Sequence, residues 1–204
     1  LKTGAEIEEK LDLAMLGSLS LVKGMKKGKS AGRIFVEDNK SVFAEAIRTI
    51  RTGVVLSSLD EPHKIVMVTS TVPGEGKTTV SMNLSLALGQ MERVLLVDAD
   101  MRRASIASQF GIDRHAPGLS NLVAGTAQTS ECVHSFEDLK IDVLPAGLIP
   151  PNPLELLSSQ RFYDLLDSLA ERYDRVVIGT APTQAVSDAL MVSTKASAVI
   201  YVIK

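Results

Sequence analysis

Residues 65–79 read IVMVTSTVPGEGKTT, and this stretch decides the fold. Ile65 to Val68 form a short run of large apolar residues, which is typical of a buried strand. A loop with two glycines follows, and the pattern from Thr78 to Leu88 predicts a helix. A strand that enters such a loop and continues as a helix is the context that a phosphate-binding loop requires. The stretch therefore predicts an α/β domain with a phosphate site at the end of this strand.

The loop itself carries the groups that bind phosphate. Gly74 and Gly76 allow the backbone to curl with its N–H groups pointing inward, and the amino end of the helix adds about half a positive charge. Lys77 can reach the β and γ phosphates of a nucleoside triphosphate, and Thr78 can offer its hydroxyl to Mg²⁺. Thr71 stands where the usual pattern has its first glycine, so the loop is a deviant form, and a glycine-rich turn without a ligand stays open as an alternative. The residues expected to bind the nucleotide are Gly74, Glu75, Gly76, Lys77, Thr78 and Thr79.

A second segment, VLLVDADMR at 94–102, predicts a strand followed by two carboxylates. Ligands of parallel sheets bind beyond the carboxyl ends of the strands. Asp98 and Asp100 are expected to project to the same side, where they can hold Mg²⁺ or accept a proton near the phosphates. A carboxylate at this place can instead cap the next helix, and this alternative stays open.

A third segment, DRVVIGTAP at 174–182, predicts another buried strand that ends in a turn. In phosphate-loop enzymes an Asp at this point positions Mg²⁺. Gly179 occupies that position here. Nucleotide binding is therefore expected to survive, while turnover is expected to suffer.

Strands and helices alternate along the rest of the chain, which indicates βαβ units. The expected fold class is α/β, with three layers: a mostly parallel sheet with helices on both faces, of the phosphate-loop NTPase kind.

Residues 1–40 are expected to be a leader without a stable element, and residues 41–204 the phosphate-loop domain. The basic run at 23–29 is interpreted as solvated linker, with contact to an anionic membrane surface as the alternative. Other expected elements are helices at 41–57, 159–171 and after residue 187, a helix-prone patch at 104–110, a proline-rich turn at 150–153, and strands at 141–144 and 198–203.

The composition excludes several classes of protein. Twenty-two Lys and Arg against 24 Asp and Glu leave a net charge of −2, which argues against a nucleic-acid partner. A single cysteine, Cys132, cannot form an internal disulfide, and the three histidines lack the spacing of a metal site. No uncharged apolar stretch approaches the ~20 residues that a membrane span needs.

Apolar residues recur every three and four positions from Ser41 to Ser57, which predicts a one-faced helix. Glu45, Arg48 and Arg51 fall together on the opposite flank, where they are expected to face solvent or a partner. A solvated face with local ion pairs is the alternative.

Three of these patterns together resemble the bacterial tyrosine kinases, the cytoplasmic kinase domains of polysaccharide co-polymerases. They are PGEGKT at 73–78, DADMR at 98–102 and the E-x-x-R-x-x-R pattern that starts at Glu45, and the likeness extends to PNPLELL at 151–157 and AVSDA at 185–189. The resemblance implies an ATP-dependent protein-tyrosine autokinase that binds ATP, ADP and Mg²⁺ and controls exopolysaccharide or capsule polymerisation and export. It implies that Lys77, Asp98 and Asp100 are catalytic, that Thr78 and Asp98 hold Mg²⁺, and that Asp98 helps to deprotonate the tyrosine.

The resemblance also implies partners and a location. The helix of Glu45, Arg48 and Arg51 packs against a neighbouring subunit in a ring, and each subunit offers a tyrosine-rich tail to the next. A longer membrane protein at the cytoplasmic face of the bacterial inner membrane is expected, with the polysaccharide export machinery and a phosphotyrosine phosphatase as partners. The three tyrosines of this chain form no such tail cluster.

Two other readings remain. A related cell-division-site or partitioning ATPase carries an additional Lys five residues before the conserved one, and Val72 at that position counts against it. In a nucleotide-binding scaffold, Gly179 has removed the chemistry while the charged helix still drives assembly.

Overall fold

The computed structural model describes residues 4–22 and 30–204 of the chain. The basic run at 23–29, interpreted above as a linker, lies outside these residues.

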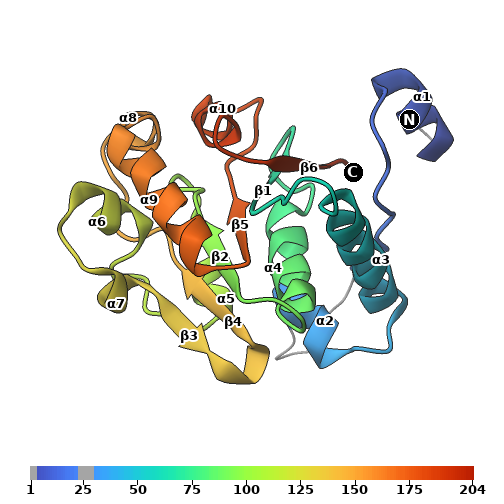
Figure 1. Ribbon diagram of the computed structural model, residues 1–204, viewed down its shortest axis with the longest axis horizontal. Helices are drawn as coiled ribbons and strands as arrows, with labels where there is room; N and C mark the ends of the chain where they lie inside the picture. Colours follow the sequence, from blue (N-terminus) through green and yellow to red (C-terminus); the bar gives the residue numbers. More distant parts are fainter. Residues whose placement is uncertain (1–3, 23–29) are drawn as a thin grey trace.

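One sheet of six strands forms the centre of the described part of the chain (Figure 1). In spatial order its strands are β3 (His134–Phe136), β4 (Ile141–Leu144), β2 (Val94–Asp98), β5 (Arg175–Gly179), β1 (Ile65–Ser70) and β6 (Ala198–Val202). Neighbouring strands are parallel, except that β3 runs antiparallel to β4. Every residue of β1, β2 and β5 is buried, because helices cover both faces of these central strands.

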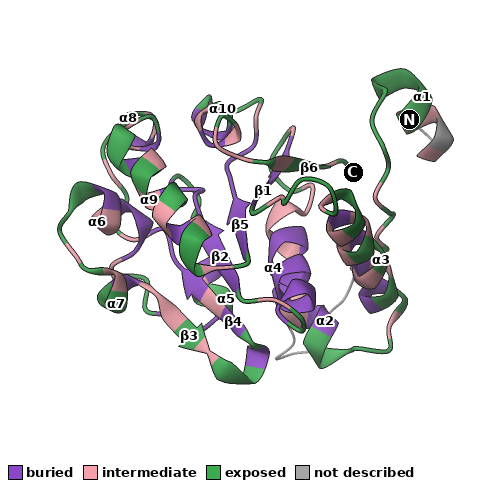
Figure 2. Ribbon diagram, viewed as in Figure 1, coloured by how far each residue is buried: buried purple, intermediate pink, exposed green. Residues whose placement is uncertain are grey.

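The helices divide the core into two layers, one on each face of the sheet (Figures 1 and 2). One face is covered by α2 (Ile34–Glu37), α3 (Val42–Ser57), α4 (Lys77–Leu88) and α5 (Ile106–Gln109). The other is covered by α6 (Leu119–Ala124), α8 (Pro153–Leu157), α9 (Gln160–Arg172) and α10 (Asp188–Ser193). Successive residues of β1 alternate between the two layers. The predicted three-layer α/β architecture is therefore confirmed.

The helix that follows the glycine loop is buried almost all round. Every residue of α4 from Val80 to Leu88 is buried, since the sheet lies on one side and α2 and α3 lie on the other. Lys77 is the first residue of this helix, one position earlier than expected. A well-packed helix gives the loop and Lys77 a rigid support.

Part of the expected leader belongs to the packed domain. Residues 31–33 form a 3₁₀ turn and α2 follows it, with Ile34 and Phe35 buried in the core. Asn83 of α4 fixes this segment, because its Oδ1 accepts the Phe35 N–H (2.8 Å) and its Nδ2 donates to the Ala31 carbonyl (2.8 Å). The expectation of no stable element before residue 41 is therefore wrong for this segment. A further helix, α1 (Gly4–Leu11), forms within the leader.

Three short elements, α7 (Thr129–Cys132), α8 and β3, differ from the elements expected from the sequence. The proline-rich turn is followed by α8, which begins at Pro153 with the Asn152 side chain accepting the Glu155 N–H (3.3 Å). The edge strand β3 and the one-turn helix α7 carry too few residues for a visible period.

Among the described residues, no helix is both long and apolar enough to cross a membrane.

Candidate active site

Three predicted segments meet at one edge of the sheet. The glycine loop follows β1, Asp98 ends β2 and Gly179 ends β5. The strand register pairs Asp98 with Gly179, and Gly179 with Val68 of β1. The carboxyl ends of the three strands therefore lie side by side, with Asp100 just beyond β2.

The glycines of the loop adopt backbone conformations that other residues rarely take. Gly74 has φ of 88° and Gly76 has φ of 98°, both in the left-handed region. A residue with a side chain would be strained at either position. The loop therefore has the curled backbone that phosphate binding requires.

The Glu75 side chain folds back onto the start of the loop. Its Oε2 accepts the N–H groups of Thr71 (2.8 Å) and Val72 (2.9 Å). The carboxylate therefore holds the loop together, and any contribution of Glu75 to nucleotide binding comes from its backbone.

Lys77 forms an ion pair with Asp100 across the site. Lys77 Nζ lies 2.8 Å from Asp100 Oδ2, and the two side chains are 13% and 6% exposed. The Asp100 carboxylate is thus a counter-charge for the ammonium group, and a bound phosphate would compete with it for Lys77. Thr78 and Thr79 lie beside Lys77 in the first turn of α4.

Asp98 organises the loop between β2 and α5. Its Oδ1 accepts the Asp100 N–H (3.2 Å), and its Oδ2 accepts the N–H groups of Ser105 and Ile106 (3.1 Å each). The helix-capping alternative is therefore realised in the structure. Burial raises the Asp98 pKa to about 6, against the lowering effect of these hydrogen bonds. A carboxylate that titrates this close to neutrality suits proton transfer.

A second ion pair ties the same loop to α10. Arg102 donates through Nε to Asp188 Oδ2 (2.8 Å) and through Nη2 to Asp188 Oδ1 (3.1 Å). Asp188 is the first residue of α10 and is buried. No role for Arg102 and no site role for Asp188 followed from the sequence. The sequence shows only that an Asp stands at the start of a predicted helix. This position does not identify Arg102, 86 residues earlier, as its partner.

Gly179 lies close to α4 and α5. A Cβ atom at this position would lie 3.3 Å from Ser81 Oγ and 3.7 Å from Ile106 Cδ1. The Gly179 carbonyl accepts the Ala99 N–H (2.8 Å), which joins β5 to the loop that follows Asp98. A side chain at this position therefore requires the buried Ser81 hydroxyl to move by a few tenths of an ångström.

Comparisons with known proteins agree with this geometry. A family model described as an AAA domain matches residues 63–203. The tyrosine-protein kinase YwqD of Bacillus subtilis is 37% identical over 171 residues, which are 83% of this chain and 72% of that protein. This chain belongs to the bacterial tyrosine-protein kinase family.

Other members of the tyrosine-protein kinase family agree in sequence and in structure. The tyrosine-protein kinase wzc of Salmonella typhimurium is 35% identical over 186 residues, which are 91% of this chain and 26% of that protein. The chain thus spans about a quarter of the length of that relative. The kinase domain of the Escherichia coli tyrosine kinase ETK superposes with a TM-score of 0.89 at 28% identity, covering 98% of this chain and 82% of that one.

The cell-division ATPases share the fold less completely. The septum site-determining protein MinD from Pyrococcus horikoshii, solved with Mg-ADP, has a TM-score of 0.57 at 27% identity and covers 68% of this chain. The kinase reading is therefore better supported than the partitioning or cell-division reading. The shared phosphate-loop fold indicates a nucleotide bound with a divalent metal ion.

The charged helix of this kinase family member differs from its expected form. Glu45 is exposed and pairs with Arg48, but both arginines are half-buried. Arg48 also donates to the Asn39 carbonyl (2.7 Å), and Arg51 Nη1 lies 3.4 Å from the Ala87 carbonyl oxygen. The three residues therefore do not form one flank open to solvent, because both arginines bind carbonyl groups of this chain.

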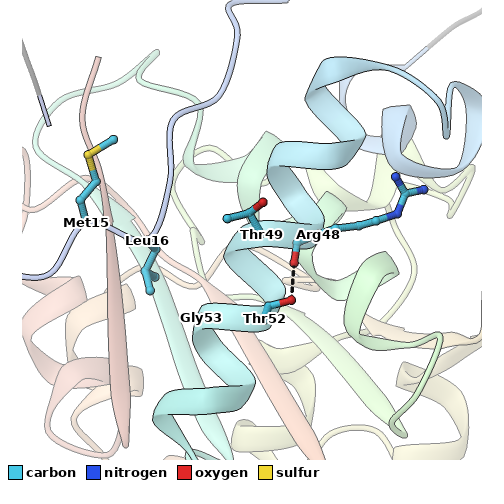
Figure 3. Close-up of a pocket in the computed structure, with 6 residues that line it drawn as sticks. All are labelled: Met15, Leu16, Arg48, Thr49, Thr52 and Gly53. Atoms are coloured by element: carbon cyan, nitrogen blue, oxygen red, sulfur yellow. Dashed lines mark hydrogen bonds between the residues drawn. The ribbon is translucent and has the colours of Figure 1, made fainter.

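The leader covers part of the same helix. A surface hollow of about 440 Å³ lies between Met15 and Leu16 of the leader and Thr49, Thr52 and Gly53 of α3 (Figure 3). A Cβ on Gly53 would come within 3.0 Å of Leu16, so the glycine lets the leader approach α3. Arg48 also lines the hollow, but its guanidinium group points away from the leader (Figure 3).

Proposed function

We propose that this chain is the catalytic domain of an ATP-dependent protein-tyrosine autokinase. The observation that carries the proposal is the ion pair of Lys77 with Asp100, with Asp98 at the end of β2 beside it, in a member of the tyrosine-protein kinase family. Phosphoryl transfer needs alignment and charge neutralisation more than covalent chemistry from the protein. Lys77, the loop N–H groups and the two carboxylates supply these functions.

Each residue has a task in this proposal. Lys77 leaves Asp100 and binds the β and γ phosphates, while the N–H groups from Gly74 to Thr79 bind phosphate oxygens. Thr78 and Asp98 would hold Mg²⁺, which would neutralise phosphate charge when bound. Asp98 takes the proton of the tyrosine hydroxyl as the tyrosine oxygen bonds to the γ-phosphorus. The bond from that phosphorus to ADP breaks, so the products are phosphotyrosine and ADP.

The whole protein is proposed to act in exopolysaccharide or capsule synthesis at the cytoplasmic face of the inner membrane. Subunits associate through the helix of Glu45, Arg48 and Arg51, and each presents a tyrosine-rich tail to its neighbour. The export machinery and a phosphotyrosine phosphatase are the proposed partners. These proposals rest on the family resemblance, because the chain spans only part of a relative such as wzc.

A nucleotide-binding scaffold is the second candidate, and Gly179 is the observation that favours it. Loss of one carboxylate that supports a metal ion commonly costs about 10- to 100-fold in activity. A scaffold would bind nucleotide and assemble with little phosphoryl transfer.

The test is to incubate the purified chain with labelled ATP, Mg²⁺ and a peptide that carries several tyrosines. Phosphotyrosine that is absent from a Lys77→Met control would support the kinase. Nucleotide binding without transfer, even for the protein extended by its natural tail, would favour the scaffold.

A further inference from the structure

The Tyr201 hydroxyl joins three segments at the phosphate edge. Its oxygen lies 2.7 Å from Thr183 Oγ1 and 3.1 Å from Thr71 Oγ1. Tyr201 belongs to the edge strand β6, Thr71 begins the glycine loop, and Thr183 lies between β5 and α10. One phenol group thus connects parts of the chain that are up to 130 residues apart.

The direction of these hydrogen bonds follows from the chemistry of the groups. Thr183 Oγ1 also lies 3.3 Å from the Ser70 carbonyl oxygen, which can only accept. With the Thr183 proton directed to Ser70, Thr183 accepts the proton of Tyr201. The Tyr201 oxygen then accepts from Thr71. The result is one directed chain from the first loop residue back to the last residue of β1.

The remaining polar groups of Thr71 are engaged as well. Its N–H donates to Glu75 Oε2 (2.8 Å), and its carbonyl accepts the Gln184 N–H (3.1 Å). The Lys204 N–H, just beyond β6, donates to Glu75 Oε1 (3.3 Å). Tyr201 of the edge strand and Lys204 just after it therefore contact the loop at two points. Thr71 stands where the usual pattern has a glycine, and its hydroxyl provides one of these contacts.

We propose that Tyr201 is a positioning residue for the phosphate loop. Its hydroxyl fixes Thr71, and through Thr71 and Glu75 it fixes the inward direction of the loop N–H groups. The assignment rests on the proposed function, which it deepens. Tyr201 is 42% exposed, so Tyr201→Phe removes the hydroxyl with little loss of packing.

The test measures binding of ADP with Mg²⁺ by calorimetry. Tyr201→Phe is expected to bind about three- to tenfold more weakly, the factor that one net hydrogen bond supplies. In a kinase assay, KM for ATP should rise by the same factor with kcat unchanged. The melting temperature without nucleotide should fall by only about 2–4 °C, the shift that about 1 kcal/mol gives in a domain of this size. Tyr163→Phe is the matched control, because the Tyr163 hydroxyl on α9 meets only the more distant Thr194 (3.4 Å) among the contacts observed.

A second pair of variants tests the route through Thr71. Thr71→Val should weaken binding as Tyr201→Phe does, Thr71→Ser should keep wild-type affinity, and the double variant Tyr201→Phe/Thr71→Val should add little to either single change. Wild-type affinity in Tyr201→Phe, or an equal loss in Tyr163→Phe, would overturn the assignment alone. Failure of the wild-type chain to bind any nucleotide would overturn the proposed function together with it.

Discussion

Lys77 Nζ and Asp100 Oδ2 lie 2.8 Å apart, and both side chains are largely shielded from water. The lysine comes from the first turn of α4 and the aspartate from the loop after β2, so the pair links the two segments that build the phosphate site. Nucleotide phosphates would replace the carboxylate as the partner of Lys77. We therefore expect nucleotide binding to replace the Lys77–Asp100 ion pair by contacts between Lys77 and phosphate.

Asp100→Asn tests this exchange. The variant leaves the Lys77 charge without its partner, so the free energy of unfolding without nucleotide should fall by about 1–3 kcal/mol. ADP should then raise the melting temperature of the variant more than that of the wild type. Thermal unfolding with and without ADP measures both effects. Asp167→Asn, which breaks an exposed pair with Lys195, is the control and should change neither.

Gly179→Asp should raise turnover. The new carboxylate would stand at the end of β5, opposite Asp98, where it can support a metal ion. We expect an increase of about 10- to 100-fold in autophosphorylation or ATPase rate at saturating Mg²⁺. Gly179→Asn has nearly the same size without the charge and should give no gain. Equal rates for wild type and Gly179→Asp would refute the idea.

Arg102→Ala should loosen α10. The substitution leaves the buried Asp188 carboxylate unpaired, although Arg102 itself is partly exposed, which weakens the effect. A loss of about 1–2 kcal/mol in the free energy of unfolding by urea is expected. Arg102→Lys keeps the charge without the two-pronged contact and should fall between. An unchanged unfolding midpoint for Arg102→Ala would contradict a structural role.

Self-association should fall when Glu45, Arg48 and Arg51 are all replaced by Ala. Because the arginines also contact their own subunit, the triple variant risks a loss of stability. Glu45→Arg is the cleaner change, since Glu45 is exposed and a reversed charge repels Arg48 and any partner arginine. Light scattering measures the mass, and urea unfolding checks that the fold is intact. A wild-type mass for both variants would exclude this helix as the interface.

The nucleotide-free protein should lose stability as pH rises through about 6. Burial raises the Asp98 pKa to about 6 in the folded state, above the ordinary value of about 3.9. The folded state thus binds the proton more tightly, and this contribution is complete below about pH 4 and lost above about pH 6. Urea unfolding at pH 4.5 and pH 7.0 measures the difference, and Asp98→Asn should flatten it. Equal pH dependence in wild type and Asp98→Asn would contradict the assignment to this carboxyl group.

Local patterns of the sequence determined the phosphate loop, the strands that flank it and the three-layer class. The loop could be predicted because the strand, the glycines, the lysine and the helix follow one another within 15 residues. Their geometry therefore depends on local backbone preferences. The carboxylates Asp98 and Asp100 at the end of β2 could be predicted for the same reason, since ligands of parallel sheets bind at strand ends.

Tertiary structure alone decided which of these groups touch. Lys77 meets Asp100, Arg102 meets Asp188, and Tyr201 meets Thr71 because the strand order β2-β5-β1-β6 brings distant segments to one edge. It also turned Arg48 and Arg51 toward carbonyl groups of the same chain, and it placed residues 31–37 of the leader against α4. Strand order and register depend on long-range packing, which no local pattern along the chain encodes.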